Sequence, residues 1–192
     1  IAQWKSACDA GESRSPSEML LRVLANPEVQ SHMGDREDSW LLAAGAAGIP
    51  VYTPGWEDST TGNMFAAAVY RGEIPHHACV WPGTRQMQHL MNWYQQNSGK
   101  GIGFFQIGGG IAGDFAICAV PTLIQDLELE ETPFWAYFCQ ISDAVTSYGG
   151  YSGAVPNEKI TWGKLAVETP KFMIESDATI VAPLIFAYLL GD

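Results

Sequence analysis

Lys164 is the side chain of this sequence best suited to covalent chemistry. It ends the segment Trp162-Gly163-Lys164, and no lysine, arginine or histidine occurs between Lys100 and Lys159. A lysine amine packed against an aromatic ring loses hydration, which favours its neutral, nucleophilic form and the formation of imines. The alternative is a surface lysine paired with a nearby glutamate, and spacing alone favours that alternative.

The stretch without cationic side chains is rich in carboxylates. Its acidic residues are Asp114, Asp126, Glu128, Glu130, Glu131, Asp143 and Glu158. We interpret the segment from Asp126 to Glu131 as a solvated acidic face. The other carboxylates lie beside glycines and aromatic residues, which better suits a site for a cationic ligand.

A glycine-rich segment offers a candidate dinucleotide site. Gly108, Gly110 and Gly113 match the pattern G-x-G-x-x-G between a predicted strand and a predicted helix. Glycines at such a turn let backbone N–H groups approach a pyrophosphate at the positive end of the helix, and Glu130 or Glu131 lies at the spacing of the expected acidic partner. Close packing of the helix on the strand explains the glycines equally well.

Two other chemistries have little support. His76-His77-Ala78-Cys79 could supply metal ligands, but no second cluster completes a set of four, so we expect no metal. Gly150-Tyr151-Ser152-Gly153-Ala154 lacks the last glycine of G-x-S-x-G, and no histidine follows it for a serine hydrolase. Cys118 and Cys139 lie in apolar runs and are interpreted as buried thiols.

Helical and strand-like segments alternate along the chain. Helices are expected at 17–24 (with Ser15 and Pro16 as cap and first turn), 37–47, 60–70, 84–96, from the glycine segment to about 124, and 179–190. Strands are expected at 49–52, 77–81, 103–107, 134–141 and 172–175. This alternation predicts a single α/β domain over 1–192, Rossmann-like, with a mostly parallel sheet and helices on both faces. Ligands of such folds bind beyond the carboxyl ends of the strands.

The composition excludes several classes of protein. The 192 residues carry a formal net charge of −11 and are 47% apolar, which is typical of a globular protein and makes a nucleic-acid partner unexpected. The apolar run from Ala178 to Leu190 contains Pro183 and is too short for a membrane span. Scattered cysteines and the lack of a visible secretory signal predict a cytoplasmic location.

Several of these motifs together resemble the deoxyhypusine synthase family. The resemblance rests on Gly108-Gly109-Gly110, Ser152-Gly153-Ala154-Val155-Pro156-Asn157-Glu158, Trp162-Gly163-Lys164 and Asp177-Ala178-Thr179, with Ile49-Pro50-Val51, Thr53-Pro54 and Asp58 upstream. It runs in order from about residue 18 to 190 and covers the C-terminal half of a typical member. The family's N-terminal dinucleotide loop has no counterpart here.

The resemblance implies an NAD-dependent transfer of an aminobutyl group. In that family NAD oxidises spermidine, the fragment is held as an imine on the lysine that matches Lys164, and an acceptor amine takes it. The acceptor is a protein lysine in deoxyhypusine synthases and a small diamine in homospermidine synthases. A catalytically silent regulatory or structural paralogue and a generic dinucleotide-binding enzyme are the alternatives. The family also implies a homotetramer, or a complex with a chain supplying the N-terminal half.

Site residues follow from the resemblance position by position. Lys164 and Asp114 would be catalytic. The residues expected to contact NAD are Asp58, Gly109, Asp143, Ala144, Asp177 and Ala178. Those expected around the polyamine are Asn63, Gly149, Gly150, Tyr151, Glu158 and Trp162.

Four of these positions depart from the family pattern. Asp114 stands where the family has a proton-relaying histidine, Asn63 and Tyr151 replace two polyamine-binding aspartates, and Asp143 replaces a threonine. A carboxylate is a weaker base than an imidazole, and the altered charges change what amine the site prefers. We therefore expect imine chemistry with an altered donor or acceptor.

Overall fold

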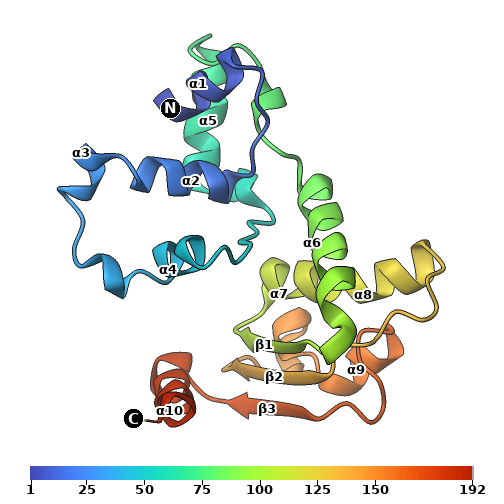
Figure 1. The fold of residues 1–192 in the computed structure, drawn as a ribbon. Coiled ribbons are helices and arrows are strands. Elements are labelled where there is room, and N and C mark those ends of the chain that lie inside the picture. The colour runs from blue at the N-terminus through green and yellow to red at the C-terminus, as the bar shows by residue number, and fades with distance from the viewer. Residues whose placement is uncertain (192) are drawn as a thin grey trace. The chain divides into compact units, whose positions relative to one another are not determined.

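The chain forms two compact units, Ile1–Gln86 and Met87–Asp192, which are described separately. The structure is a computed structural model, and it describes residues 1–191 (Figure 1). Within these residues no helix is both long and apolar enough to cross a membrane.

The first unit is helical. Its helices and short 3-10 turns are α1 (Ala2–Asp9), α2 (Pro16–Leu24), α3 (Pro27–Gln30), η1 (Arg36–Asp38), α4 (Trp40–Ala46), η2 (Trp56–Asp58), α5 (Thr60–Tyr70) and η3 (His77–Cys79). The predicted start of α2 is confirmed, because Ser15 and Glu18 form a reciprocal capping box and Pro16 follows the cap. Trp4 and Phe65 meet edge to face at 5.2 Å in the core of this unit.

Two predicted strands in this unit are wrong. Residues 49–52 form an irregular segment, in which the Ser17 hydroxyl donates to the Val51 carbonyl at 2.6 Å instead of a neighbouring strand. Residues 77–81 begin as the turn η3, and only one bridge, between Arg14 and Val80, remains of a strand. The predicted helix over 37–47 begins later, at Trp40, and ends as expected before Gly48, whose φ is +66°.

The second unit holds the sheet. Its elements after α6 (Gly83–Asn97), which starts in the first unit, are η4 (Ser98–Lys100), β1 (Gly103–Ile107), α7 (Gly110–Ile117), α8 (Ala119–Pro121), the π-helical turn η5 (Thr122–Asp126), β2 (Tyr137–Ser142), η6 (Thr146–Tyr148), η7 (Tyr151–Gly153), α9 (Pro156–Thr161), β3 (Lys171–Glu175) and α10 (Ala178–Leu190). The strands pair in the order β1-β2-β3, all parallel. The predicted α/β class is confirmed, with helices flanking a parallel sheet.

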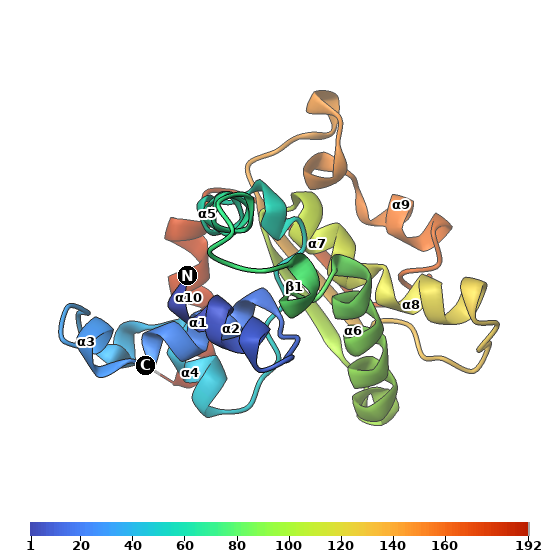
Figure 2. The ribbon, with the colours of Figure 1, turned by 90° about the horizontal axis from the view of Figure 1, so that it is seen from above.

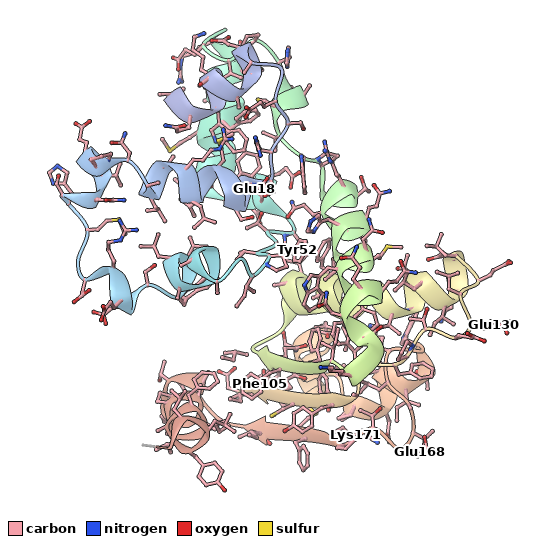
Figure 3. The ribbon with its side chains drawn as sticks, viewed as in Figure 1. Glu18, Tyr52, Phe105, Glu130, Glu168 and Lys171 are labelled. Carbon is pink, nitrogen blue, oxygen red and sulfur yellow. The ribbon has the colours of Figure 1, made fainter. Side chains whose placement is uncertain are left out.

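One face of the sheet carries the core of this unit. Phe104 and Phe138, opposite each other in the register, pack with Tyr94 of α6, Ile117 of α7 and Leu123 of η5. These helices therefore share one side of the sheet (Figures 1 and 2). On the other face, Phe186 of α10 lies 5.7 Å from Phe105, and Figure 3 marks Phe105 on β1.

The apolar helix expected after the glycines is interrupted. It runs as α7, α8 and η5 in succession, with Pro121 at the junction of the last two. Proline cannot donate a backbone hydrogen bond, and a π-turn accommodates one extra residue in a helix. Strand β2 begins at Tyr137, three residues later than the predicted start at 134.

Candidate active site

Lys164 is buried and paired with Asp114. It follows α9 through Gly163, whose φ of +68° makes the turn, and its backbone N–H donates to the Lys159 carbonyl at 3.0 Å. The Lys164 Nζ lies 2.9 Å from Asp114 Oδ1, and only 5% of the lysine side chain is exposed. A lysine so deeply buried is rare unless its charge is paired. Of the two interpretations of Lys164, the structure excludes the surface lysine.

Asp114 reaches this amine from the middle of α7. Its side chain is half exposed, which leaves one side open to solvent or ligand. The thiol of Cys118, one turn further along, donates to Asp114 Oδ1 at 3.6 Å. Burial raises the pKa of the Cys118 thiol to about 11, so it stays a neutral donor at physiological pH. Asp114 Oδ1 is thus shared between the Lys164 amine and the neutral Cys118 thiol.

Tyr151 forms the aromatic wall of the site. Lys164 Nζ lies 5.3 Å from the centre of its ring and 5.9 Å from the ring of Trp162. The Tyr151 hydroxyl donates to Gln106 Oε1 on β1 at 2.9 Å, and burial raises the pKa of Tyr151. Tyr151 therefore serves as a neutral aromatic surface for cations rather than as a base.

These side chains surround one pocket of about 550 Å³. It is lined by Asp114, Cys118, Pro121, Thr122, Gln125, Asp126, Gly150, Tyr151, Ala154, Glu158, Trp162 and Lys164. Glu158 Oε2 is buried there and has no hydrogen-bond partner. An unpaired buried carboxylate oxygen is costly, so the pocket is suited to a ligand that brings a hydrogen-bond donor, such as an ammonium.

Most predicted cofactor residues lie at one edge of the sheet. Gly109, Asp143 and Asp177 follow the carboxyl ends of β1, β2 and β3, and the parallel register brings those ends together. Ala144 and Ala178 are the next residues along the chain. Asp177 caps α10 by accepting from the Thr179 backbone at 2.8 Å, whereas Asp143 is exposed.

The glycine segment fits a dinucleotide. Gly108 and Gly110 have φ of +76° and +66°, and a Cβ at either would meet nothing within 4 Å, so ligand atoms can approach this backbone closely. At Gly109 a Cβ would lie 2.4 Å from Ser152 Oγ, so only glycine is accommodated. The open space beside Gly108 and Gly110 favours the ligand explanation of these two glycines. At Gly113 a Cβ would lie 2.8 Å from Gln106 Oε1 of β1, so close packing of the helix on the strand explains that glycine.

Asp58 and Asn63 lie in the other compact unit. Asp58 ends the turn η2, Asn63 lies on α5, and both side chains are exposed. The structure therefore brings Lys164, Asp114, Tyr151, Glu158 and Trp162 into one pocket, with Gly150 on its rim. Gly149, with φ of +73°, ends the preceding turn η6 and does not line the pocket.

Only Cys79 of the histidine–cysteine cluster lies in a core, and His76 and His77 are exposed. Cys8 Sγ lies 3.3 Å from His76 Nδ1, and Cys8 and Cys79 are both buried. Among the residues that the structure describes, no three histidine, cysteine or acidic side chains form a group that could hold a metal ion.

Sequence reasoning missed three buried polar side chains near the site. Gln106 and Gln140 stand opposite each other on β1 and β2, and both donate to the Gly108 carbonyl at 2.9 Å. Lys159 on α9 is fully buried. A glutamine inside each of two apolar strands was a usable signal for the first two, but nothing local marked Lys159.

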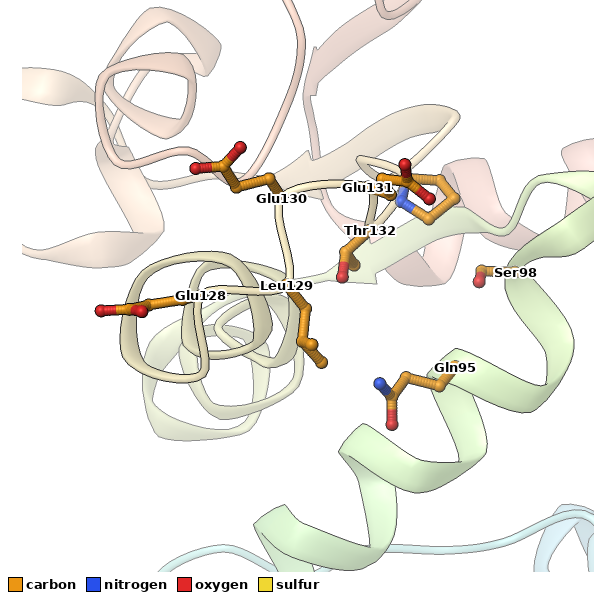
Figure 4. A pocket seen from close by; sticks show the side chains of 8 residues that line it. Gln95, Ser98, Glu128, Leu129, Glu130, Glu131 and Thr132 are labelled. Carbon is orange, nitrogen blue, oxygen red and sulfur yellow. The ribbon is translucent and has the colours of Figure 1, made fainter.

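A second pocket of about 550 Å³ lies at the acidic segment (Figure 4). It is lined by Gln95, Ser98, Glu128, Leu129, Glu130, Glu131, Thr132 and Pro133. The three glutamates are exposed, and those of 128 and 130 point away from the cavity in Figure 4. This agrees with the prediction of a solvated acidic face.

The fold and the pocket together define an α/β protein with a buried, carboxylate-paired lysine beside a glycine turn. A family model for deoxyhypusine synthase matches residues 3–189. A deoxyhypusine synthase-like protein of Nostoc punctiforme is 32% identical over 168 residues, which is 85% of this chain and 42% of that protein. A probable deoxyhypusine synthase of Aeropyrum pernix is 30% identical over 164 residues, covering 82% and 46% of the two chains.

The chain belongs to the deoxyhypusine synthase family. It spans less than half the length of these two relatives.

Proposed function

We propose that this chain carries the imine-forming half of an NAD-dependent aminobutyl transferase that acts on a polyamine such as spermidine. The observation that carries the proposal is the 2.9 Å pair of Lys164 Nζ and Asp114 Oδ1 in a pocket with an unpartnered Glu158 oxygen. This arrangement offers a nucleophile, a proton acceptor and an ammonium site within one cavity.

The chain's own residues account for the transfer of the fragment. Asp114 Oδ1 takes a proton from Lys164 Nζ, and the neutral amine attacks the carbon of the oxidised substrate's C=N bond. A new C=N bond forms to Nζ while the original C–N bond breaks, and Asp114 returns its proton to the departing amine. An acceptor amine reverses these steps to remove the fragment. The chemistry supplied by bound NAD is removal of a hydride from the amine and its return to the product.

The remaining predicted residues have binding roles in this proposal. Gly109, Asp143, Ala144, Asp177 and Ala178 would hold NAD at the carboxyl edge of the sheet. Glu158 would bind an ammonium, and Trp162, Tyr151, Gly149 and Gly150 would surround the polyamine chain. The roles of Asp58 and Asn63, which belong to the other unit, stay predictions from the resemblance.

Borohydride trapping tests the proposal directly. The full protein, with any partner chain, is incubated with NAD and labelled spermidine or putrescine and then reduced. We expect label on the peptide that contains Lys164 and none in Lys164→Ala. Lys171→Ala is the control, because Lys171 is a lysine of the same unit whose amine donates to backbone carbonyls at the start of β3, outside the pocket (Figure 3). Absence of label from Lys164 in the wild type would overturn the proposal.

A small diamine is the second candidate acceptor. It is favoured by Asn63 and Tyr151, which lack the negative charges that the resemblance implies at these positions. Product analysis with labelled spermidine and unlabelled putrescine separates the two, because homospermidine forms only if the diamine accepts. A silent paralogue is favoured instead if a partner complex consumes spermidine equally well with Lys164→Ala.

We also propose an oligomer, a homotetramer or a complex with a chain that supplies the N-terminal half, acting in the cytoplasm. Membership of the family supports the oligomer, and the four free cysteines of the chain support a reducing compartment. A persistent monomer in light scattering would contradict the oligomer.

A further inference from the structure

Lys159 is a second buried amine, next to Tyr151 of the pocket wall. Its side chain is completely excluded from solvent, and its Nζ donates to the Ala154 carbonyl at 3.1 Å. The same Nζ lies 4.8 Å from the ring centre of Tyr151 and 5.1 Å from that of Phe138. Two aromatic rings and a carbonyl oxygen stabilise an ammonium without neutralising it. Lys159 therefore contributes a positive charge that forms no ion pair with a carboxylate of residues 1–191.

This charge shares the ring of Tyr151 with Lys164. The two Nζ atoms lie 4.8 and 5.3 Å from the centre of that one ring. Burial lowers the pKa of Lys159, Glu158 and Asp114 raise it, and the Lys164 ammonium lowers it. These influences place Lys159 electrostatically in the site although its side chain does not line the pocket.

The pocket therefore has few carboxylates left that could bind the ammonium groups of a polyamine. Asp114 is engaged by Lys164, and Asp126 is exposed, so solvent screens it. Glu158 Oε2 is the one buried oxygen of these three carboxylates that has no partner. The ring of Tyr151, which could otherwise receive an ammonium, already faces two.

Resting on the proposed function, we infer that Lys159 is a specificity-determining residue that limits the pocket to one substrate ammonium, bound at Glu158. A diamine meets this limit, because one amine is at the reacting end and the other pairs with Glu158. A triamine must place a further ammonium in the same low-dielectric pocket as Lys159, where like charges repel more strongly than in water. The chain therefore favours diamines over triamines as bound amines.

Equilibrium binding of putrescine and spermidine tests this inference without requiring any chemistry. Calorimetry on the full protein, in the assembly in which it is isolated, gives the ratio of the two affinities. Lys159→Met removes the charge but keeps an unbranched apolar side chain of similar length. We expect this variant to raise the affinity for spermidine relative to putrescine by about tenfold. Lys171→Met should leave the ratio unchanged.

A second variant keeps the test decisive if Lys159→Met does not fold. Tyr151→Asp places a carboxylate against the Lys159 ammonium, and we expect the ratio to move in the same direction. An unchanged ratio in a folded variant, including equal weakening of both amines, would show that Lys159 has only a structural role and would overturn the inference. Failure of both amines to bind the wild type would overturn it as well.

The outcome of the trapping experiment is independent of the affinity ratio, so the two proposals can fail separately. If the ratio changes as expected but borohydride leaves Lys164 unlabelled, the specificity role of Lys159 stands and the transferase proposal falls. If Lys164 is labelled and the ratio is unchanged, the transferase proposal stands alone.

Discussion

Two pockets of about 550 Å³ in the second unit are both lined by acidic residues. In the pocket at Lys164 an ion pair is buried on one side, and a carboxylate oxygen lacks a partner. In the pocket at residues 128–133 the glutamates are exposed, and water satisfies them. The two pockets therefore have the same volume and similar charges, but we expect them to bind cations very differently, because the energy of a charge depends on its solvation.

This difference shows which carboxylates can do chemistry. A solvated glutamate pairs weakly with any cation, whereas a desolvated one binds an ammonium strongly and selectively. The composition alone treats both groups as one acidic stretch. Five substitutions separate the pockets experimentally.

The largest expected effect follows Lys164→Arg. The guanidinium keeps a positive charge near Asp114 but cannot form an imine, so borohydride should trap no label on the variant. Thermal unfolding should stay within a few degrees of the wild type, because the ion pair persists. Label that remains on this segment would assign the imine to another amine, with Lys159 the first to examine.

Asp114→Asn should slow trapping about 100-fold. An amide keeps the shape of the side chain but cannot accept the proton of Lys164, and loss of a proton acceptor commonly costs this much. Single-turnover trapping measures the rate. Asp126→Asn, in the same pocket but exposed, should change it less than threefold. Equal effects of the two variants would remove the distinction between paired and solvated carboxylates.

Tyr94 supports the loop of the second pocket, and its contribution to the free energy of unfolding should change at high pH. Its hydroxyl donates to the Pro133 carbonyl at 2.8 Å, and burial raises the pKa of Tyr94 to about 12. Unfolded tyrosine ionises near pH 10, so between pH 10 and 12 the folded state binds more protons and the free energy of unfolding falls as pH rises. In Tyr94→Phe this decrease in the free energy of unfolding should be smaller by about 2 kcal/mol.

Urea unfolding at pH 8, 10 and 11.5 measures this difference. At pH 8 the variant should be less stable by about 1 kcal/mol, because the Pro133 carbonyl loses its donor. Tyr188→Phe, at a largely exposed position, should show no pH-dependent change. An alkaline loss of stability identical in the Tyr94 variant and the wild type would contradict the prediction.

Glu158→Gln should weaken the binding of putrescine about tenfold. The amide replaces a charge-assisted hydrogen bond with a neutral one in a buried position. Glu130→Gln, in the second pocket, should change the same affinity less than twofold, because its carboxylate is solvated. Calorimetry on both variants compares the pockets directly, and comparable losses would show that acidity alone binds the amine.

The smallest expected effect concerns the backbone of the acidic loop. Within residues 1–191, Glu128 is the one non-glycine residue with positive φ, at 56°. Glu128→Gly relieves left-handed strain but adds freedom to the unfolded chain, so we expect a net gain of about 0.5 kcal/mol. Urea unfolding detects it, and Glu130→Gly should give no gain.

The sequence predicted the elements whose determinants are local. The capping box at Ser15 set α2, and apolar periodicity set α6 to within one residue at each end. The segments at 49–52 and 77–81 have the composition of strands but no continuous partner. Side chains such as Ser17 bind their backbone instead. Pairing is a property of distant segments, so composition could not reveal its absence.

The candidate site was predicted through motif order and not through geometry. The family pattern grouped Lys164, Asp114, Tyr151 and Glu158 as residues of one site. The structure places them in one pocket. The burial of Lys159 depends on Phe138, which comes from a strand distant in sequence. No pattern near Lys159 could report that contact.

Gln140 has a consequence for how the two ligand regions respond to each other. Its Nε2 donates to the carbonyls of Gly108 and Ser152, at 2.9 and 2.8 Å, and so spans the glycine turn and the loop that carries Tyr151. Because both hydrogen bonds leave one nitrogen atom, Gln140 links the two loops at a single point. The glycine turn and the loop of Tyr151 are therefore coupled through one side chain, and a displacement of either carbonyl strains the hydrogen bond to the other.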